Sequence, residues 1–295
     1  MSGASLDPRV DAWRRQGALQ QISGHRIFVQ DRDGGGPPLL FLHGYPSSSY
    51  DWRHVIELLP ERRLTAFDFL GFGLSDKPPD VRYSLLAQAD IVETVARRFA
   101  GAPLVLVAHD MGSSVATELM ARAVEGRLSF PLRAVVLTNA SLVRERASLL
   151  WGQKLLLSRL GPLASRLTNQ LTFRRQFAGI FSAEHPLSPE EAADQWSLLV
   201  QDGGHRLLAR LIYYNHERVT PPNAQRWHEA LRDWTGELSL GWAGQDPICT
   251  EAVLQAVLAL RPNAPLTRWP ALGHYPQLED PAAVAELIRR ILDSA

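Results

Sequence analysis

The stretch LVAHDMGSS, residues 106–114, decides the fold because it combines the end of a strand, a sharp turn and the start of a helix. Its first half is apolar and predicts a buried strand, and a helix is predicted from residue 112 onward. So sharp a turn requires small residues two positions before and two after its tip, where the backbones approach closely. Ala108 and Gly112 supply them, and the tip is Asp110.

Asp110 has two interpretations. Asp is a good N-cap, so it could simply cap the helix that follows. The pattern small-x-nucleophile-x-Gly also resembles the nucleophile elbow of the α/β-hydrolase fold, with Asp in place of Ser. The loop FLHGYP (41–46) favours the nucleophile, because in that fold the equivalent loop lends a backbone N–H to an anion hole. Here Tyr45 would provide that N–H and Met111 the second one.

The surrounding chain predicts a doubly wound, mostly parallel sheet. Nearly continuous apolar runs are typical of strands buried on both faces, and helix-like stretches at 84–100 and 112–124 alternate with them. A hairpin or edge strand is expected within 25–38. Strands are predicted at 38–44, 63–69, 102–110, 132–140, 237–244 and 264–269, and later helices at 250–260 and 282–293.

The sequence pattern changes in the segment from about 141 to 230. This segment is predicted to be helical, is rich in Leu, Arg and Trp, and contains no obvious strands. The predicted organisation is an α/β-hydrolase core formed by 1–140 and 231–295, with a helical cap domain at 141–230. The cap's apolar residues are expected to form its own core and to line part of an apolar cavity.

Composition excludes several classes of partner. Lys and Arg together number 31, as do Asp and Glu, so neither nucleic acid nor an anionic membrane is expected as a partner. No apolar run approaches the roughly 18 residues that span a bilayer. A single cysteine, Cys249, permits no internal disulfide, and the N-terminus shows no secretory signal, so a cytoplasmic location is expected. The protein is expected to be a monomer or a homodimer.

Two partners for Asp110 lie in the order this fold requires, an acid and then a histidine. Asp246 in WAGQDPI and His274 in ALGHYPQLEDP each follow a predicted strand. Taken singly, Asp246 could be a turn former and His274 a surface or packed residue. Taken together they predict a triad. The remaining histidines show no metal-ligand spacing, and neither a metal nor a cofactor is expected.

A carboxylate nucleophile indicates a particular chemistry. Attack on an ester would give an anhydride, whereas attack on a saturated carbon bearing a leaving group gives an alkyl ester on the enzyme. His274, held by Asp246, can then activate water to hydrolyse that ester. The leaving group is either a ring-opened epoxide oxygen, which needs a proton from a weak acid, or a halide, which needs only N–H dipoles.

The sequence resembles the epoxide hydrolase and haloalkane dehalogenase branch of the α/β-hydrolases, and within it the mesoderm-specific transcript protein group. The stretches HGYPSSSYDW, DFLGFGLSDKPP, YSLLAQADIVE and HYPQLEDP carry the resemblance, which runs from about 38 to 282 and is weak in the cap. It implies the Asp110–Asp246–His274 triad, a helical cap and an alkyl-enzyme ester. Dehalogenases of this branch hold halide with Asn and Trp where this chain has Tyr45 and Met111.

The resemblance implies a tyrosine acid in the cap. YYNHER (213–218) resembles the cap segment of soluble epoxide hydrolases, with Tyr213 as proton donor and Tyr214 as the alternative register. Substrate contact is expected from Tyr214, His43 and Trp151.

The predicted function is therefore cofactor-free hydrolysis of a small apolar epoxide or related electrophile. The alternatives are a haloalkane dehalogenase with the same triad, and a small-molecule-binding scaffold without turnover. A carboxylesterase would need a serine at the tip, and Ser113 and Ser114 come too late.

Overall fold

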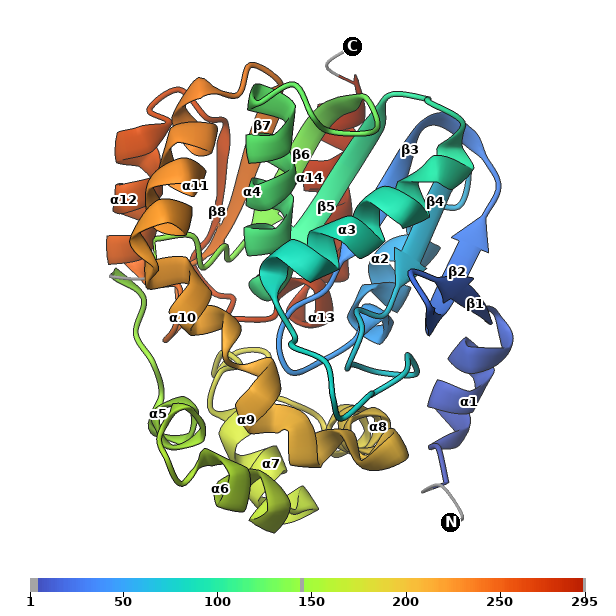
Figure 1. The fold of residues 1–295 in the computed structure, drawn as a ribbon, viewed down its shortest axis with the longest axis vertical. Coiled ribbons are helices and arrows are strands. Elements are labelled where there is room, and N and C mark those ends of the chain that lie inside the picture. Colours follow the sequence, from blue (N-terminus) through green and yellow to red (C-terminus); the bar gives the residue numbers. More distant parts are fainter. Residues whose placement is uncertain (1–4, 144–145, 294–295) are drawn as a thin grey trace.

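A computed structural model describes residues 5–143 and 146–293 of the chain. Its centre is an eight-stranded sheet in the order β1-β2-β4-β3-β5-β6-β7-β8 (Figure 1). Every pairing from β4 to β8 is parallel, and β1 and β2 add antiparallel pairs at one edge. The strands are β1 (Ala18–Ile22), β2 (His25–Arg32), β3 (Gly35–Leu42), β4 (Arg62–Phe67), β5 (Leu104–His109), β6 (Leu132–Thr138), β7 (Glu237–Ala243) and β8 (Leu266–Trp269).

Helices cover both faces of this sheet (Figure 1). One face carries α3 (Leu85–Ala96), α4 (Met111–Val124), α11 (Pro221–Asp233) and α12 (Glu251–Leu260). The other carries α2 (Arg53–Glu57), α13 (Pro276–Glu279) and α14 (Pro281–Asp293), with α1 (Pro8–Arg15) near the β1–β2 edge. Short 3-10 turns occur at Ser49–Trp52, Arg97–Phe99 and Gln201–Leu207.

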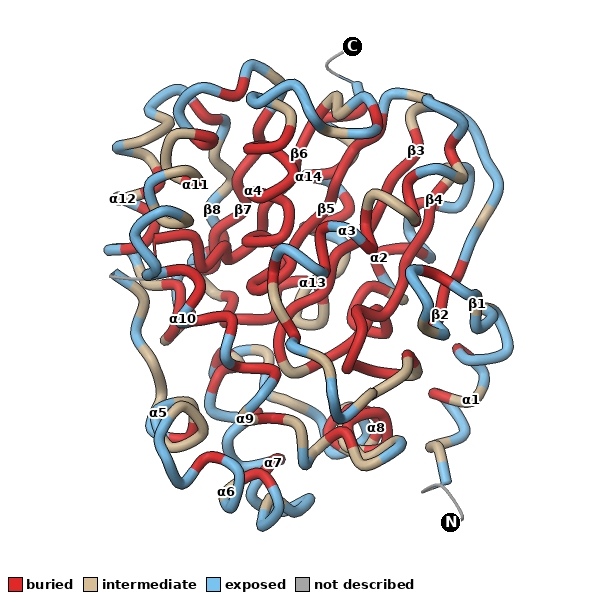
Figure 2. Tube along the Cα trace, in the orientation of Figure 1, coloured by how far each residue is buried: buried red, intermediate tan, exposed pale blue. Residues whose placement is uncertain are grey.

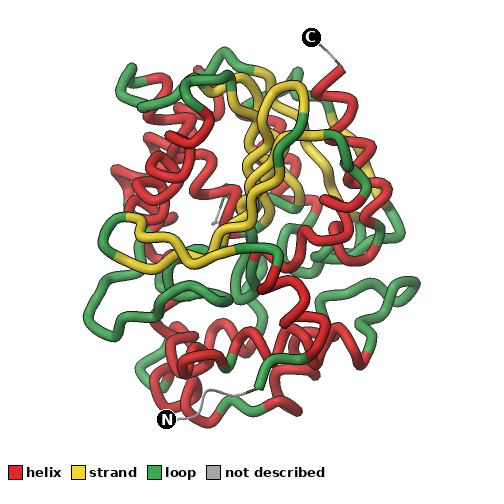
Figure 3. Tube along the Cα trace, turned by 90° about the vertical axis from the view of Figure 1, so that its right-hand side faces the viewer, coloured by secondary structure: helices red, strands yellow, loops and turns green. Residues whose placement is uncertain are grey.

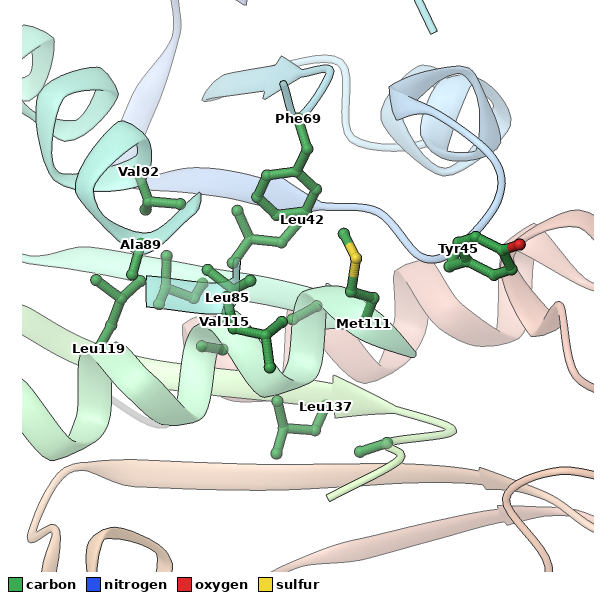
Figure 4. Close-up of a cluster of buried hydrophobic side chains, with 14 of the residues drawn as sticks. Leu42, Tyr45, Phe69, Leu85, Ala89, Val92, Met111, Val115, Leu119 and Leu137 are labelled. Atoms are coloured by element: carbon green, nitrogen blue, oxygen red, sulfur yellow. The ribbon is translucent and has the colours of Figure 1, made fainter. Parts of the chain in front are cut away.

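The central strands are buried on both faces, as their apolar runs predict. Every residue of β5 is buried, and Figure 2 shows the burial concentrated along β5, β6 and α4. Figure 4 shows how α4 packs: Val115 and Leu119 meet the side chains of α3 and of neighbouring strands. Met111 and Tyr45 lie at the end of this cluster, where the strands finish.

The α/β-hydrolase fold expected from the sequence is confirmed, with element ends shifted by a few residues. The segment 25–38 contains β2, which pairs with β1 in a hairpin and with β4 on its other side. β2 is therefore not an edge strand. The strand β1 and the helix α1 were not predicted.

The chain between β6 and β7 is helical, and most of it forms a separate layer beyond one end of the sheet (Figures 1 and 3). Its last helix, α11, leaves that layer and packs on α4, where the Trp227 indole donates to Glu118 at 2.8 Å. Among the described residues, no helix combines the length and the apolar character needed to cross a bilayer. The other helices are α5 (Trp151–Leu157), α6 (Gly161–Leu167), α7 (Gln170–Ala178), α8 (Pro189–Leu199), α9 (Leu208–Leu211) and α10 (Tyr214–Val219).

Candidate active site

The turn between β5 and α4 is as sharp as its residues predict. Asp110 has φ 44° and ψ −112°, a conformation that costs a residue with a Cβ about 1–3 kcal/mol. A Cβ on Gly112 would lie 2.5 Å from the carbonyl oxygen of Leu42 and 2.7 Å from that of His43. Only glycine allows α4 to start so close to the end of β3, so the strained tip is held in place by packing.

The Asp110 carboxylate does not cap α4, because no side-chain cap hydrogen bond forms there. Instead its Oδ2 accepts a hydrogen bond from the backbone N–H of Tyr45 at 3.0 Å. Met111 is buried and is the first residue of α4, so its N–H has no acceptor within the helix. The structure thus brings both predicted anion-hole residues beside the carboxylate. Among the described residues, none donates a hydrogen bond to Oδ1.

The predicted acid and histidine also meet at this end of the sheet. Nδ1 of His274 lies 2.7 Å from Oδ2 of Asp246, and both side chains are buried. Oδ1 of Asp246 accepts from the backbone N–H groups of Ile248 and Cys249 at 2.7 and 3.0 Å. Burial works against the Asp246 carboxylate, but His274 and these donors outweigh it and hold its pKa below the ordinary value.

The charge of Asp110 also acts on His274. Burial lowers the pKa of the imidazole, yet the Asp246 and Asp110 carboxylates outweigh burial and raise it above its ordinary value. Part of the proton affinity of His274 therefore depends on Asp110 being ionised. Neutralising Asp110 would make His274 a weaker base and favour its unprotonated form.

Asn139 is a site residue that the sequence analysis missed. It follows β6 with φ 44°, and its Nδ2 donates to Oδ2 of Asp246 at 2.6 Å. Its Oδ1 accepts from the N–H of Ala243 at 3.1 Å, which ties β6 to the end of β7. The available signal was a polar residue directly after a buried strand, at the edge where Asp110 and Asp246 also lie.

His109 contacts the backbone of His274. Its Nε2 lies 2.7 Å from the carbonyl oxygen of His274, and the Gln277 amide lies 3.1 Å from its Nδ1. Burial lowers the pKa of His109 to about 4, so the ring is neutral at pH 7. His109 thereby fixes the backbone that presents His274.

His43 is held between two loops, which argues against the substrate contact expected of it. Its Nε2 accepts from the N–H of Phe69 at 3.0 Å, and its Nδ1 lies 2.8 Å from the carbonyl oxygen of Gly44. Because both nitrogens are occupied and the ring is fully buried, His43 joins the loops after β3 and β4 and has no free polar atom for a ligand.

The two cap tyrosines are placed oppositely. Tyr213, the predicted acid, is 43% exposed and its ring packs beside His216 and the Arg82 guanidinium. Tyr214 is buried, with its ring centroid 5.9 Å from that of Tyr45. Burial and then the Asp110 charge raise the pKa of Tyr214 well above its ordinary value. Successive helical residues point about 100° apart, so only one of the two can face Asp110, and in this structure the buried one is Tyr214, the alternative register, rather than Tyr213.

Arg218 is the second residue that was missed. It is buried one turn after Tyr214, and its guanidinium carbon lies 4.5 Å from the centre of the Tyr214 ring. Its Nε and one terminal nitrogen donate to the hydroxyls of Ser114 and Ser141, each at 2.7 Å. No carboxylate of the described residues pairs with it. The (i, i+4) spacing from Tyr214 was the signal available.

A cavity of about 460 Å³ extends from Tyr45 and Ile248, which lie beside the site, into the helical layer. At the site end it is lined by Tyr45 and Ile248, and at the other end by Trp151, which is 74% exposed. Trp151 thus lies at the rim of the cavity. The remaining lining is mainly apolar and comes from α5, α6 and α7, for example Leu155, Leu156, Leu167, Phe173 and Phe177.

Three possible metal ligands converge at the triad, although their sequence spacing does not reveal it. Asp246, Cys249 and His274 bring ligand atoms within 4.8 Å of one another. Both oxygens of Asp246 are already hydrogen-bonded, and burial raises the pKa of the Cys249 thiol, which disfavours the thiolate that metals bind. These groups suit proton transfer better than metal coordination.

Comparison with known proteins gives matches along almost the whole chain. A model of the alpha/beta hydrolase family matches residues 39–287. LipZ of Mycobacterium tuberculosis, designated a hydrolase with no substrate in its name, is 49% identical over 285 residues, or 97% of this chain and 98% of that protein. The mesoderm-specific transcript protein of Mus musculus is 33% identical over 290 residues, or 94% and 85% of the two chains.

Shorter and more distant matches include an epoxide hydrolase and two haloalkane dehalogenases. Epoxide hydrolase 3 of Mus musculus is 33% identical over 99 residues, 32% of this chain and 27% of that protein. A haloalkane dehalogenase of Agrobacterium fabrum is 40% identical over 82 residues, 28% and 27% of the two chains. The crystal structure of haloalkane dehalogenase DbeA from Bradyrhizobium elkani has the same fold, with a TM-score of 0.78, 22% identity and coverage of 93% and 96%.

Proposed function

The chain belongs to the alpha/beta hydrolase family, and we propose that it hydrolyses epoxides through an ester on Asp110. The observation that carries the proposal is the pair formed by Asp110 and Tyr214. A carboxylate stands at the elbow with one oxygen held by the Tyr45 N–H. The buried phenol of Tyr214 packs on the Tyr45 ring at 5.9 Å and under the Arg218 guanidinium, which donates to the Asp110 carbonyl oxygen at 3.5 Å. A nucleophile facing a weak acid is what epoxide opening needs.

In the first step, Oδ1 of Asp110 attacks an epoxide carbon. The carbon–oxygen bond of the ring breaks, and the leaving oxygen takes the proton of the Tyr214 hydroxyl. Tyr214 is suited to this because burial keeps its phenol protonated, while the Arg218 cation over its ring favours the phenolate that forms. The product is a hydroxyalkyl ester of Asp110.

In the second step, water hydrolyses that ester. Ester formation removes the negative charge of Asp110, and with it one cause of the high proton affinity of His274. The unprotonated imidazole then accepts a proton from water, and Asp246 stabilises the imidazolium that results. The N–H groups of Tyr45 and Met111 hold the tetrahedral oxyanion. On collapse the bond between the acyl carbon and the diol oxygen breaks, the departing oxygen takes the remaining proton of the attacking water, and the diol leaves Asp110 as a carboxylate. The proton on His274 returns to the Tyr214 phenolate through solvent.

The helical residues between β6 and β7 serve in this proposal as a cap that keeps bulk water from the ester. Contacts from this layer support that role. The carbonyl oxygen of Ile180 accepts from the N–H of His274 at 2.8 Å, and the rings of Phe177 and Tyr275 lie 4.9 Å apart. Tyr214 belongs to the same segment, so one segment contributes both the proposed acid and the proposed cap.

Two features favour an epoxide over a haloalkane. A halide leaves without a proton, so a dehalogenase has no use for a buried phenol beside its nucleophile. Halide binding instead needs N–H donors near the leaving group, and Tyr45 and Met111 carry no side-chain N–H. The indole N–H groups of Trp227 and Trp242 are engaged with Glu118 and the Cys249 carbonyl.

The test is to trap the ester. His274→Gln removes the base, so the ester should accumulate when the variant meets a pool of epoxides and haloalkanes, and the intact protein mass should rise by that of a whole epoxide. Asp110→Asn/His274→Gln should show no gain. His54→Gln, which changes an exposed histidine, should turn over without accumulating the ester.

Each other outcome changes the assignment. A gain equal to a haloalkane minus hydrogen halide would make the protein a dehalogenase. No adduct on His274→Gln, together with a wild-type enzyme inert toward the same pool, would contradict the proposal and favour a binding role for the scaffold.

A further inference from the structure

The segment 150–183, which contains α5, α6 and α7, has an unusual charge pattern. It carries five basic residues and no Asp or Glu, although the whole chain has a net charge of zero. The five are Lys154, Arg159, Arg166, Arg174 and Arg175, and all are exposed. The neutral total, from which no membrane contact is expected, therefore conceals a strongly basic region. We call the exposed part of this segment the basic cap surface.

The cations of the basic cap surface are available to a partner. None of the five side chains forms an ion pair or hydrogen bond with another described residue. Elsewhere exposed arginines commonly find carboxylates, as Arg14 and Arg15 do on Asp11 and Arg268 does on Glu251. The absence of acids across α5–α7 leaves these five charges uncompensated on the protein itself.

Large apolar side chains lie between these cations. The most exposed hydrophobic residues of the described chain are concentrated here, and Figure 2 shows α6 and α7 as largely exposed. Leu163 and Leu167 share one face of α6, and Leu171 lies outward on α7 while Phe173 and Phe177 of that helix point inward. The exposed set is Trp151, Leu160, Leu163, Leu167 and Leu171.

The cavity opens on the same surface. Trp151 and Leu167 are 74% and 67% exposed, yet both also line the cavity that reaches Tyr45. An apolar ligand could pass from the basic cap surface to the site along a largely apolar wall. Cations, exposed leucines, a rim tryptophan and an apolar channel thus occur together.

We propose that the basic cap surface docks on an anionic lipid bilayer. Its lysine and arginines would meet lipid phosphates while its leucines and Trp151 enter the interface, the arrangement of amphipathic segments that lie on membranes. Docking would place the mouth of the cavity at the lipid, so that an apolar substrate enters without crossing water. This last point rests on the proposed function, whereas docking does not.

Two other occupants fit less well. A second copy pairing through the same face would set cations against cations, because a twofold contact brings a surface onto itself. A nucleic acid would use the cations but would leave five large apolar side chains without a role. An anionic bilayer would contact both the cations and the apolar side chains.

The test is flotation with vesicles, in the absence of any substrate. Wild-type protein should bind vesicles containing about one-third phosphatidylglycerol in phosphatidylcholine, should bind pure phosphatidylcholine far less, and should be released as salt rises. Arg159→Gln/Arg166→Gln/Arg174→Gln should lower the partition coefficient about a hundredfold. Leu163→Ser/Leu171→Ser should lower it about tenfold.

The control applies one change of each kind elsewhere. Arg97 and Leu19 are also exposed, but they lie outside the segment, so Arg97→Gln/Leu19→Ser should bind as wild type does. Equal binding by the triple arginine variant and wild type would overturn the proposal, as would no binding to either vesicle.

The alternative occupants also have distinct signatures. Loss of binding with the arginine changes alone, and not with the leucine changes, would indicate a general polyanion site and contradict membrane docking. A stable dimer that Leu163→Ser/Leu171→Ser converts to monomer would assign the surface to self-association. Because none of these readouts needs turnover, failure here would leave the ester-trapping result untouched.

Discussion

The site around Asp110 and the basic cap surface are constructed in opposite ways. Around Asp110 the titratable groups of the triad are buried and hydrogen-bonded, and the tip has a strained backbone held by close packing. At the basic cap surface the charges are exposed and unpaired, and leucines contact solvent. The site holds its groups at fixed positions, whereas the basic cap surface leaves its groups available to a partner.

This difference suits the role that we propose for each region. Catalysis requires groups whose positions do not change, and strain is tolerated only where the surroundings determine the conformation. A docking surface must instead present groups whose partners are absent from the chain. Burial is concentrated in the sheet and α4, so substitutions should cost more stability there than in α5–α7. Four predictions test this.

The largest effect is expected at Tyr214. Tyr214→Phe should lower the rate of ester formation from epoxides by about 10²- to 10⁴-fold, because the leaving oxygen loses its proton donor. Tyr213→Phe changes an exposed neighbour and should stay close to wild type. The measurement is single-turnover kinetics in the His274→Gln background. If the two variants behaved alike, Tyr214 would not be the acid.

A large loss of stability is expected at Gly112. Gly112→Ala forces a Cβ to within 2.5 Å of a backbone oxygen that cannot retreat, and should lower the free energy of unfolding by about 2–3 kcal/mol. Gly179 ends α7, and a Cβ there would meet its neighbours at an ordinary 3.5 Å. Gly179→Ala should therefore change stability by no more than about 0.5 kcal/mol in urea unfolding. Equal losses would remove the contrast between the two regions.

The pH dependence should report the coupling of Asp110 and His274. Ester hydrolysis needs the unprotonated imidazole, so below the pKa of His274 in the ester its rate should fall about tenfold per pH unit. Removing the Asp110 charge disfavours the imidazolium, so Asp110→Asn should lower the pKa of His274 relative to wild type. NMR titration of the ring checks this. An unchanged or higher pKa in Asp110→Asn would contradict the coupling.

The smallest effect is expected at Leu163. It is 54% exposed, so Leu163→Ser should change the free energy of unfolding by no more than about 0.5 kcal/mol. Urea unfolding of the two proteins is the measurement. A loss of 2 kcal/mol or more would mean that this leucine packs within the protein, and would weaken the argument that it is free to meet a membrane.

The triad was predictable because each of its members follows a strand. Apolar runs identify buried parallel strands, and parallel strands bring their carboxyl ends to one edge, so Asp110, Asp246 and His274 could be placed together without coordinates. The small residues at Ala108 and Gly112 indicated the sharp turn for the same local reason. His274 and Asp246 are indeed 2.7 Å apart.

The surroundings of the triad could not be predicted in the same way. The choice between Tyr213 and Tyr214 depends on the rotation of α10 about its axis, which packing against Tyr45 and Arg218 decides. His43 looked available for a ligand because its partner Phe69 lies 26 residues away, after another strand. Asn139 and Arg218 act through contacts with residues far along the chain.

The sequence by itself determined where the buried strands lie, where the sharp turn occurs and which residue stands at its tip, because these depend on side-chain size and apolar patterning over a few neighbouring residues. Only the tertiary structure decided that Tyr214 rather than Tyr213 is buried near Asp110, that both ring nitrogens of His43 are occupied, and that the unpaired cations gather around the mouth of the cavity. Those properties arise from distances between segments that meet only on folding, and no local pattern encodes them.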